Sequence, residues 1–185
     1  NLNCGIFRER DKMSIYVTSD IHGMYGKFIK MLETINIGED DTLYVLGDMV
    51  DRGPHPVRVI QKIMSMKNVK TILGNHDSGA LGTLRFLAAN ESIEGCSVTE
   101  REFQTLSNQE KTAVIDFLSG LPLYYDITVN DKRYILVHGG LGNFAPCKAM
   151  DEYSVDELVW TRPDYSRPYY DDVTVVCGHT PTQLI

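Results

Sequence analysis

Apolar residues in the first half of the chain follow two different periods. Runs rich in apolar residues at 15–19, 43–46 and 69–73 predict buried strands, because each run is short and ends at polar or glycine residues. Between these runs, apolar residues recur at helical spacing at 28–35 and 57–64, which predicts two amphipathic helices. Strands that alternate with helices are typically parallel and joined by right-handed crossovers. The first half therefore predicts a parallel sheet covered by helices.

The second half of the chain has a different pattern. A helix is predicted at about 79–89, whereas 90–106 shows little periodicity and is expected to form a surface excursion near the site. Segments 123–129 and 133–137 are separated by a polar turn and predict a β-hairpin. The architecture should therefore change from parallel to mixed or antiparallel in this half.

Two capping-box patterns mark the starts of helices in the same half. Ser107 is followed three residues later by Glu110, and Ser154 by Glu157. A last apolar run at 173–177 predicts the final strand. Together these elements indicate an α/β fold of the mixed α+β kind.

Length and composition fit a single domain. The chain has 185 residues, of which 43% are hydrophobic, and this is enough for one packed core. Met13 leads straight into the first predicted strand, so we expect one domain at 13–185, preceded by an N-terminal extension at 1–12. Because the chain stops soon after the last predicted strand, we also expect that C-terminal strands of the domain are missing.

The acidic balance of the chain narrows the range of partners. The formal charge of -7, from 25 acidic and 18 basic residues, disfavours a surface that binds nucleic acid. No apolar run approaches the roughly 20 residues of a membrane helix, and the N-terminus lacks the core of a signal peptide. We therefore expect a cytoplasmic protein without nucleic-acid or membrane partners, and its four scattered cysteines should stay reduced. The pattern specifies no oligomeric state.

Side chains that can bind metal ions follow directly after five of the predicted strands. In chain order they are Asp20, His22, Asp48, Asn75, His76, His138 and His179. Parallel strands bring their carboxyl ends to the same edge of a sheet, so the side chains that follow the first three strands should converge there.

These ligand types indicate a site for two metal ions. Carboxylate, imidazole and amide groups suit manganese, iron or zinc better than calcium. Six ligands are too many for one tetrahedral ion, but they make two sites if Asp48 bridges them. One ion would then bind Asp20, His22 and Asp48, and the other would bind Asp48, Asn75, His138 and His179. Two such cations can bind a hydroxide together with the oxygens of a phosphoryl group.

Further residues would complete a site for phosphoryl transfer. Arg52 and a second arginine would bind the remaining phosphate oxygens, because guanidinium groups match their geometry. His76 is placed to protonate the leaving oxygen, and a hydrogen bond to Asp51 would favour its imidazolium form. His55 lies between two prolines and is expected to be structural or exposed to solvent.

Five motifs carry a resemblance to a known family. They are Asp20-Ile21-His22-Gly23, Gly47-Asp48-Met49-Val50-Asp51-Arg52-Gly53, Gly74-Asn75-His76-Asp77, Val137-His138-Gly139-Gly140 and Gly178-His179-Thr180. In this order, and over nearly the whole chain, they resemble the calcineurin-like metallophosphoesterases. More narrowly, they are similar to the serine/threonine phosphoprotein phosphatases in their short bacterial and lambda-phage form.

The resemblance implies a fold, a cofactor and further site residues. The fold would be a β-sandwich of mixed sheets flanked by helices. The cofactor would be a pair of divalent metal ions, usually manganese, and metal-bound water would attack phosphorus directly. Arg162, which follows Trp160 and Thr161, would be the second phosphate arginine. We expect Asn75 to lie beside the substrate phosphate as well as on a metal ion.

The expected activity is hydrolysis of a phosphomonoester by a serine/threonine protein phosphatase, with a phosphorylated protein or peptide, or a small phosphoester, as substrate. An alternative is a symmetrical bis(nucleosyl)-tetraphosphatase, which would act on dinucleoside polyphosphates. Those enzymes share the Asn-His-Asp form of the third motif but tend to have alanine where Asp51 stands. A second alternative, a non-catalytic metal- or phosphate-binding module, requires a lost ligand, and none of the six is lost.

Overall fold

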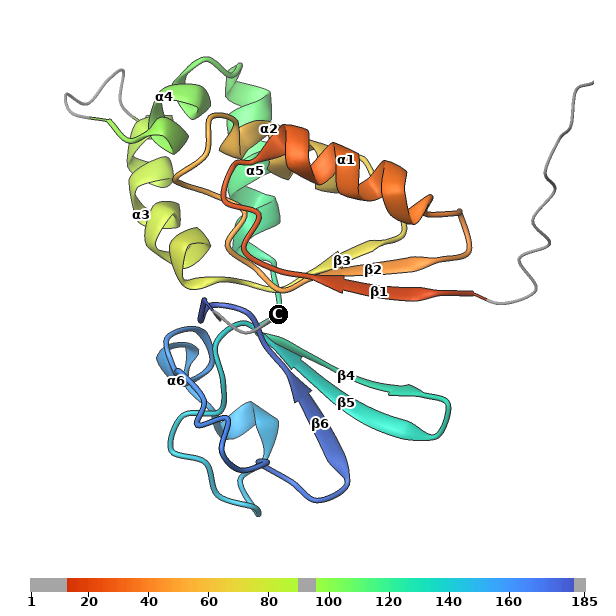
Figure 1. The fold of residues 1–185 in the computed structure, drawn as a ribbon. Helices are drawn as coiled ribbons and strands as arrows, with labels where there is room; N and C mark the ends of the chain where they lie inside the picture. Colours follow the sequence, from red (N-terminus) through yellow and green to blue (C-terminus); the bar gives the residue numbers. More distant parts are fainter. Residues whose placement is uncertain (1–12, 90–95, 182–185) are drawn as a thin grey trace, which may run out of the picture.

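Two three-stranded sheets lie against each other in the computed structural model, which describes residues 13–89 and 96–181 (Figure 1). The strands of the first sheet are all parallel and lie in the order β1 (Ile15–Thr18), β2 (Thr42–Val45) and β3 (Val69–Thr71). The strands of the second sheet lie in the order β4 (Tyr124–Val129), β5 (Lys132–Val137) and β6 (Val173–Val176). In this sheet β4 is antiparallel to β5 whereas β6 is parallel to it, so the expected mixed architecture is confirmed.

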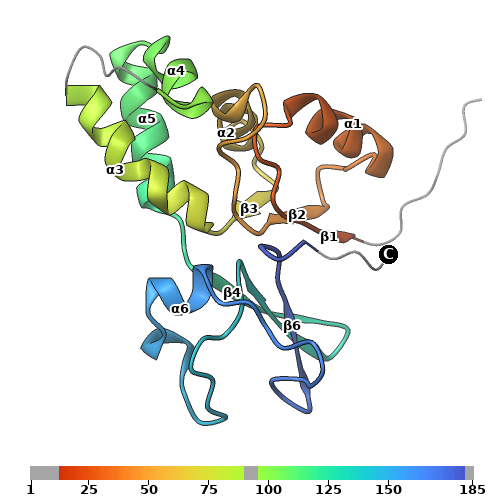
Figure 2. The ribbon, with the colours of Figure 1, turned by 60° about the vertical axis from the view of Figure 1, so that its left-hand side comes forward.

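Most of the helices lie on the side of the first sheet that faces away from the second (Figures 1 and 2). They are α1 (Tyr25–Ile35), α2 (Pro56–Met64), α3 (Asn75–Ala89), α4 (Val98–Gln104) and α5 (Asn108–Ser119). A 3-10 turn at Met150–Glu152 and the short α6 (Val155–Val159) accompany the second sheet. Among the residues that the structure describes, no helix has both the length and the apolar character needed to cross a membrane.

Strand β2 is buried on both faces and joins two layers of the core. Successive side chains of a strand point to opposite faces. Leu43 and Val45 therefore pack with the helices in the largest apolar cluster, whereas Tyr44 and Leu46 pack with Leu136 between the two sheets. A third cluster covers the outer face of the second sheet, where Val137 of β5 meets residues of α6. The carboxyl end of β2 is thus fixed from both sides.

Several predicted elements are confirmed, and two differ. The hairpin of β4 and β5 and the capping boxes before α5 and α6 are present as expected. Helix α3 begins at Asn75 rather than near 79, so the third motif forms the first turn of a helix. Part of 90–106 is not an irregular excursion, because α4 starts at a capping box of Ser97 and Glu100 and buries Phe103. Residues 1–12 and 90–95 lie outside the described residues.

Candidate active site

The loops that follow β1 and β2 run side by side beyond the ends of these strands. His22 N donates to the carbonyl of Asp48 at 2.9 Å, and Gly23 N donates to the carbonyl of Met49 at 2.8 Å. Gly53 N then donates back to the carbonyl of His22 at 2.8 Å. These bonds extend the parallel pairing of the strands, so the first two motifs form one rigid unit.

Many of the predicted site residues have a left-handed backbone, which is uncommon for residues other than glycine. They are Asp20 (φ 51°), His22 (φ 45°), Asp48 (φ 54°), Asp51 (φ 66°), Arg52 (φ 62°) and His179 (φ 61°). The other described non-glycine residues with positive φ are all Asn or Asp, the types that adopt this conformation most readily. Backbone strain of this kind persists where surrounding contacts impose it, and it gathers at functional sites.

Asp48 lies at the centre of the site, and its side chain is almost fully buried. Its Oδ2 is 3.4 Å from Nε2 of His22, and its Oδ1 is 3.4 Å from Nε2 of His138. Oδ1 also accepts a hydrogen bond from the backbone N of His76 at 2.9 Å. A Cβ atom at Gly74 would collide with this carboxylate and with the backbone N of Asp48, so the position requires glycine. One carboxylate therefore lies between two imidazoles, as a bridging ligand would.

Two of the histidines face a backbone carbonyl oxygen with Nδ1. Nδ1 of His22 lies 2.8 Å from the carbonyl oxygen of Val50, and Nδ1 of His138 lies 2.6 Å from that of Leu46. Because a carbonyl oxygen only accepts hydrogen bonds, each Nδ1 holds a proton, and Nε2 of a neutral His22 ring then presents a lone pair to the site. Nε2 of His22 is buried without a hydrogen-bond partner. An imidazole lone pair beside a buried carboxylate, left without a donor, fits a metal ion.

Asn75 joins the second group of candidate ligands. Its Oδ1 lies 2.9 Å from Nε2 of His138 and 2.9 Å from Nδ1 of His179. Burial lowers the pKa of His179, and the charges of His138 and Arg162 lower it further, which favours the neutral imidazole that binds metal. Two sets of side chains bring potential ligand atoms together and share Asp48: His22, Asp48 and His76, and Asp48, His138 and His179.

Asp20 lies at the edge of this arrangement. Its Oδ1 is 3.9 Å from Nε2 of His22, and its Oδ2 accepts hydrogen bonds from Ser19 Oγ at 2.5 Å and from His179 N at 2.9 Å. A Cβ atom at Gly178 would overlap Ser19 and Asp20, so glycine allows the end of β6 to reach the end of β1. All six predicted ligands therefore lie in one connected site, with His76 beside them.

Asp77 holds the backbone of the site in place, a role that the sequence did not reveal. Its side chain is fully buried, and it accepts hydrogen bonds from the backbone N of Asp48 at 2.8 Å, Met49 at 2.9 Å, Gly74 at 3.1 Å and Val50 at 3.3 Å. Burial and the charge of Asp48 raise the pKa of Asp77 to about 6, although the bonds from backbone N–H groups act in the opposite direction. The carboxylate thus ties the loop after β2 to the start of α3.

A chain of hydrogen bonds orients His76. Its Nδ1 lies 2.7 Å from Oδ2 of Asp51, as the sequence predicted. Thr99 Oγ1 donates to the other oxygen of Asp51 at 2.7 Å and accepts from Asp51 N at 3.0 Å. Nε2 of His76 accepts a hydrogen bond from Nη2 of Arg52 at 3.3 Å. Thr99 was missed, although the capping box of α4, the helix that holds it, is readable in the sequence.

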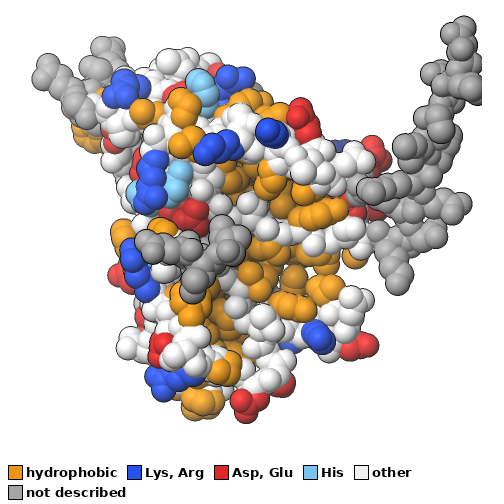
Figure 3. All heavy atoms as spheres, viewed as in Figure 1, with side chains coloured by type: hydrophobic (Ala, Val, Ile, Leu, Met, Phe, Trp, Pro, Cys, Tyr) orange, Lys and Arg blue, Asp and Glu red, His pale blue; other side chains and the backbone are white. Residues whose placement is uncertain are grey.

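The two remaining predicted residues differ in their surroundings. Arg162 is exposed, and it lies near enough to His179 for its charge to lower the pKa of that imidazole. Trp160 is 56% exposed, and its ring centroid is 6.1 Å from that of His179. His55 lies beside Glu102, with 3.4 Å between Nδ1 and Oε1, and takes no part in the ligand groups, as expected. In Figure 3 a histidine lies between basic and acidic side chains where the two halves of the molecule meet.

Comparisons with known proteins agree with this geometry. Residues 13–183 match the model of the calcineurin-like phosphoesterase family. A symmetrical bis(5'-nucleosyl)-tetraphosphatase of Nitrosococcus oceani is 35% identical over 132 residues, which are 70% of this chain and 44% of that protein. The enzyme of the same name in Salmonella paratyphi C is 30% identical over 131 residues, again 70% and 44% of the two chains. The chain thus spans less than half the length of these curated relatives.

A solved structure shows the same fold. The metallophosphoesterase from Sphaerobacter thermophilus superimposes with a TM-score of 0.57 at 19% identity, over 87% of this chain and 58% of that chain. The predicted arrangement of two sheets flanked by helices is therefore confirmed, although only the second sheet is mixed.

The expectation of a serine/threonine protein phosphatase is wrong, because the curated relatives are named tetraphosphatases. Both kinds of enzyme fit the five motifs, so the expectation rested on Asp51 alone. Asp51 is bonded to His76 and Thr99. These bonds fix the orientation of the His76 ring and involve no group of a substrate, so Asp51 does not identify the substrate.

Proposed function

Because the chain belongs to the calcineurin-like phosphoesterase family, we propose that it hydrolyses dinucleoside polyphosphates at the site around Asp48. The observation that supports this substrate best is the 35% identity, over 70% of the chain, to a protein named symmetrical bis(5'-nucleosyl)-tetraphosphatase. Cleavage of a dinucleoside tetraphosphate at its central anhydride gives two nucleoside diphosphates.

The six clustered ligands are our proposed metal site. Asp20, His22 and Asp48 would hold one divalent ion, and Asp48, Asn75, His138 and His179 would hold the other, with manganese as the proposed metal. The unpartnered Nε2 of His22 and the shared carboxylate of Asp48 support this assignment. Bound there, two cations supply Lewis acidity and lower the pKa of water so that it can act as a nucleophile.

The arginines orient the polyphosphate. Arg52 and Arg162 flank the ligand groups on the loop after β2 and the segment after α6, and two guanidinium groups can bind the unesterified oxygens of one phosphate. In the reaction, the oxygen of water forms a bond to an inner phosphorus while the bond from that phosphorus to the bridging oxygen breaks. The electron pair leaves with the nucleoside diphosphate, and the proton that water loses passes to the solvent. Asn75 would contact the attacked phosphate in addition to binding a metal ion.

His76 is the proposed proton donor for the leaving oxygen. Its Nδ1 is held by Asp51, so its Nε2 points away from that carboxylate toward Arg52. Once Arg52 binds a substrate phosphate, Nε2 is released to carry the proton for the leaving oxygen, while Nδ1 stays on Asp51 and Thr99 keeps Asp51 in place. A nucleoside diphosphate is a better leaving group than an alkoxide, so the proton should matter less for this substrate than for an alkyl phosphate.

The decisive experiment compares substrates with the manganese-loaded chain. We expect diadenosine tetraphosphate to be hydrolysed to adenosine diphosphate alone, and a chelator to abolish turnover. Chromatography of the products would detect adenosine monophosphate with adenosine triphosphate, a pair that contradicts symmetrical cleavage. A higher kcat/KM for a phosphoserine peptide than for diadenosine tetraphosphate would contradict the proposed substrate.

A further inference from the structure

A pocket of about 460 Å3 lies beside the ligand groups, between the loop after His138 and the segment that follows α6. Its lining includes Asn143, Phe144, Arg162, Arg167 and Tyr169, and we call it the nucleotide pocket. Its volume is in the range typical of small-molecule sites, about 300–1,000 Å3. Arg162, one of the proposed phosphate ligands, is part of its wall, so the pocket opens next to the reacting centre.

The loop that forms one side of the pocket is held close to α6. Gly139 N donates to the carbonyl of Leu158 at 2.8 Å, and Gly142 N donates to the carbonyl of Glu157 at 3.0 Å. A Cβ atom at Gly142 would meet Thr161 Oγ1 at 2.5 Å, so the loop and the opposite wall are in close contact at this point. The lining of the pocket therefore starts at Leu141, three residues after the proposed metal ligand His138.

Its side chains combine aromatic rings with guanidinium groups. Phe144 packs edge-to-face on Tyr169, with 5.1 Å between the ring centroids, and on Tyr170, with 5.0 Å. The hydroxyl of Tyr169 accepts a hydrogen bond from Leu141 N at 3.1 Å, which fixes that ring. Aromatic faces stack on bases, and arginines bind phosphates. This is the combination that a nucleoside diphosphate requires.

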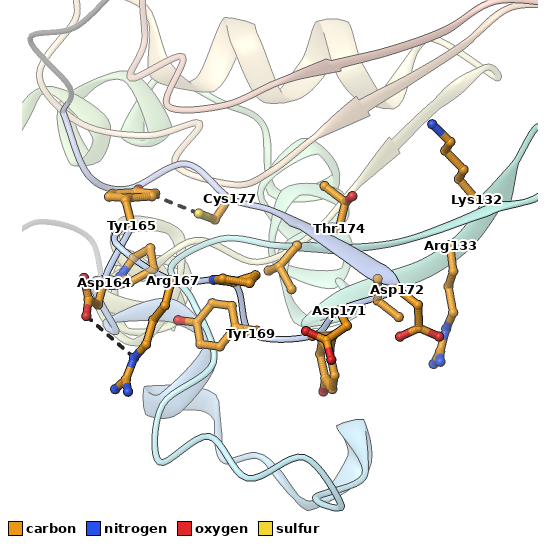
Figure 4. A pocket seen from close by; sticks show the side chains of 15 residues that line it. Lys132, Arg133, Asp164, Tyr165, Arg167, Tyr169, Asp171, Asp172, Thr174 and Cys177 are labelled. Atoms are coloured by element: carbon orange, nitrogen blue, oxygen red, sulfur yellow. Dashed lines mark hydrogen bonds and ion pairs between the residues drawn. The ribbon is translucent and has the colours of Figure 1, made fainter.

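Arg167 is available for a phosphate. Its Nε lies 3.7 Å from Oδ2 of Asp164, and the two side chains are 83% and 61% exposed (Figure 4). An exposed ion pair of this kind contributes little, so the guanidinium group can exchange the carboxylate for a phosphate. Arg162 and Arg167 lie on the same wall, with Arg162 nearer to His179. A polyphosphate can therefore extend from the ligand groups along this wall.

A larger cavity, of about 640 Å3, is a weaker candidate. It lies against the second sheet and shares Asp164, Arg167, Pro168 and Tyr169 with the nucleotide pocket. The rest of its lining includes Lys132, Arg133, Asp171 and Asp172 (Figure 4). Arg133 is already held by a two-pronged bond to Asp126, with Nε at 3.0 Å and Nη2 at 2.6 Å. The carboxylates of Asp171 and Asp172 would repel a polyphosphate, so the part of this cavity that lies beyond the shared residues does not suit the substrate.

Resting on the proposed function, we propose that the nucleotide pocket binds one nucleoside diphosphate half of the substrate. Arg167 binds the phosphate nearer the ribose, and the rings of Phe144 and Tyr169 contact the nucleoside. These residues determine specificity for nucleotide-bearing substrates, and a phosphate without a nucleoside does not need them.

The test compares diadenosine tetraphosphate with p-nitrophenyl phosphate, using the manganese-loaded full chain. Arg167→Ala should raise the KM for diadenosine tetraphosphate by about 5- to 30-fold, the effect of losing one charged hydrogen-bond partner. Its kcat/KM for p-nitrophenyl phosphate should stay within about twofold, because that substrate does not extend into the pocket. Phe144→Leu should raise the KM for diadenosine tetraphosphate by about 3- to 10-fold, because a stacking face is lost.

The matched control is Arg133→Ala, which removes an arginine from the larger cavity and should leave both substrates unaffected. Asp164→Asn should lower the KM for diadenosine tetraphosphate, because a charge that competes for Arg167 is removed. Circular dichroism and the thermal midpoint would show that each variant is folded. An unchanged KM for diadenosine tetraphosphate in Arg167→Ala and in Phe144→Leu would overturn the nucleotide pocket and leave the proposed function intact. A wild-type chain that hydrolyses p-nitrophenyl phosphate but not diadenosine tetraphosphate would overturn both.

Discussion

The two sheets contribute unequal halves to the site. On the side of the first sheet, the loops after β1 and β2 are bonded to each other, and buried Asp77 accepts hydrogen bonds from four backbone N–H groups of this half. On the side of the second sheet, residues 162–168 are mostly exposed, and Arg162 and Arg167 extend from them. Rigid elements position reacting groups, whereas exposed loops vary more easily. From this difference we infer that the first half positions the reacting groups and the second half selects the substrate.

The largest expected effect comes from Asp48→Asn, which removes the central carboxylate of the rigid half. A bridging carboxylate neutralises part of the charge of two cations, and an amide does not, so both metal sites should weaken. We expect kcat to fall on the order of 10³-fold or more, since metal ions supply several kcal/mol of transition-state stabilisation. Elemental analysis after dialysis, together with kcat, measures both effects.

The control for this variant is His55→Ala, at a histidine outside the ligand groups, where the rate should be close to that of the wild type. Two tightly bound ions and near-normal turnover in Asp48→Asn would show that Asp48 does not bridge.

The next effect concerns His76 and Asp51, whose contact with Thr99 extends the rigid half to α4. General-acid groups typically contribute about 10²–10⁴-fold, and the loss should grow as the leaving group becomes poorer. His76→Asn should therefore slow hydrolysis of phenyl phosphate by about 10²-fold, but slow p-nitrophenyl phosphate and diadenosine tetraphosphate by about tenfold or less. Steady-state kinetics on the three substrates measure how the loss in rate depends on the leaving group.

The double variant of Asp51→Asn and His76→Asn tests whether the two residues act together or independently. It should be little slower than His76→Asn alone, because Asp51 acts through His76. Equal losses on all three substrates would remove the proton-donor role from His76.

Substitution of the arginines compares the two halves directly, because Arg52 lies in the rigid half and Arg162 in the exposed half. Lysine keeps the charge but cannot form a two-pronged bond to a phosphate. We expect kcat/KM for diadenosine tetraphosphate to fall by about 10-fold in Arg52→Lys and in Arg162→Lys, in line with the loss of one charged hydrogen bond. Arg85→Lys on α3, where the arginine bonds to Ser119, is the matched control. A variant with unchanged kcat/KM would exclude that arginine from phosphate binding.

Much of the rigid half could be predicted from the sequence. Apolar runs located β1, β2 and β3, and the parallel order of these strands brought Asp20, Asp48 and Asn75 to one edge without further assumption. Capping boxes located α5 and α6 because both partners of each box lie within one turn. These successes share one property, which is that the signal is local or follows directly from strand direction.

The residues that were missed depend on contacts between distant segments. Thr99 lies 48 positions from Asp51, and the bond between them exists only because α4 packs beside the loop after β2. Asp77 was visible as part of a motif, but its four backbone partners depend on the tertiary fold. The substrate was predicted wrongly for another reason, since the five motifs fit both kinds of enzyme and only the relatives distinguish them.

The smallest expected effect concerns Glu157, which stiffens the exposed half. Its Oε1 accepts hydrogen bonds from Lys148 Nζ and Asn143 Nδ2, each at 2.8 Å, and its Oε2 accepts one from Ser154 N at 2.9 Å. The bond from Lys148, followed by those from Ser154 and Asn143, lowers the pKa of Glu157 to about 2 from its ordinary value of 4.5.

A pKa that is lower in the folded state means that this carboxylate stabilises the fold fully above pH 4.5 and loses its effect as the pH falls toward 2. Glu157→Gln should therefore lower the thermal midpoint slightly at pH 7 and by less at pH 3, because an ion pair at the surface contributes little. It should also raise the KM for diadenosine tetraphosphate by about twofold, because Asn143 belongs to the nucleotide pocket, while p-nitrophenyl phosphate is unaffected. Equal changes for both substrates would mean that Glu157 supports the reacting centre itself, and the division between a rigid catalytic half and an exposed selecting half would fail at this residue.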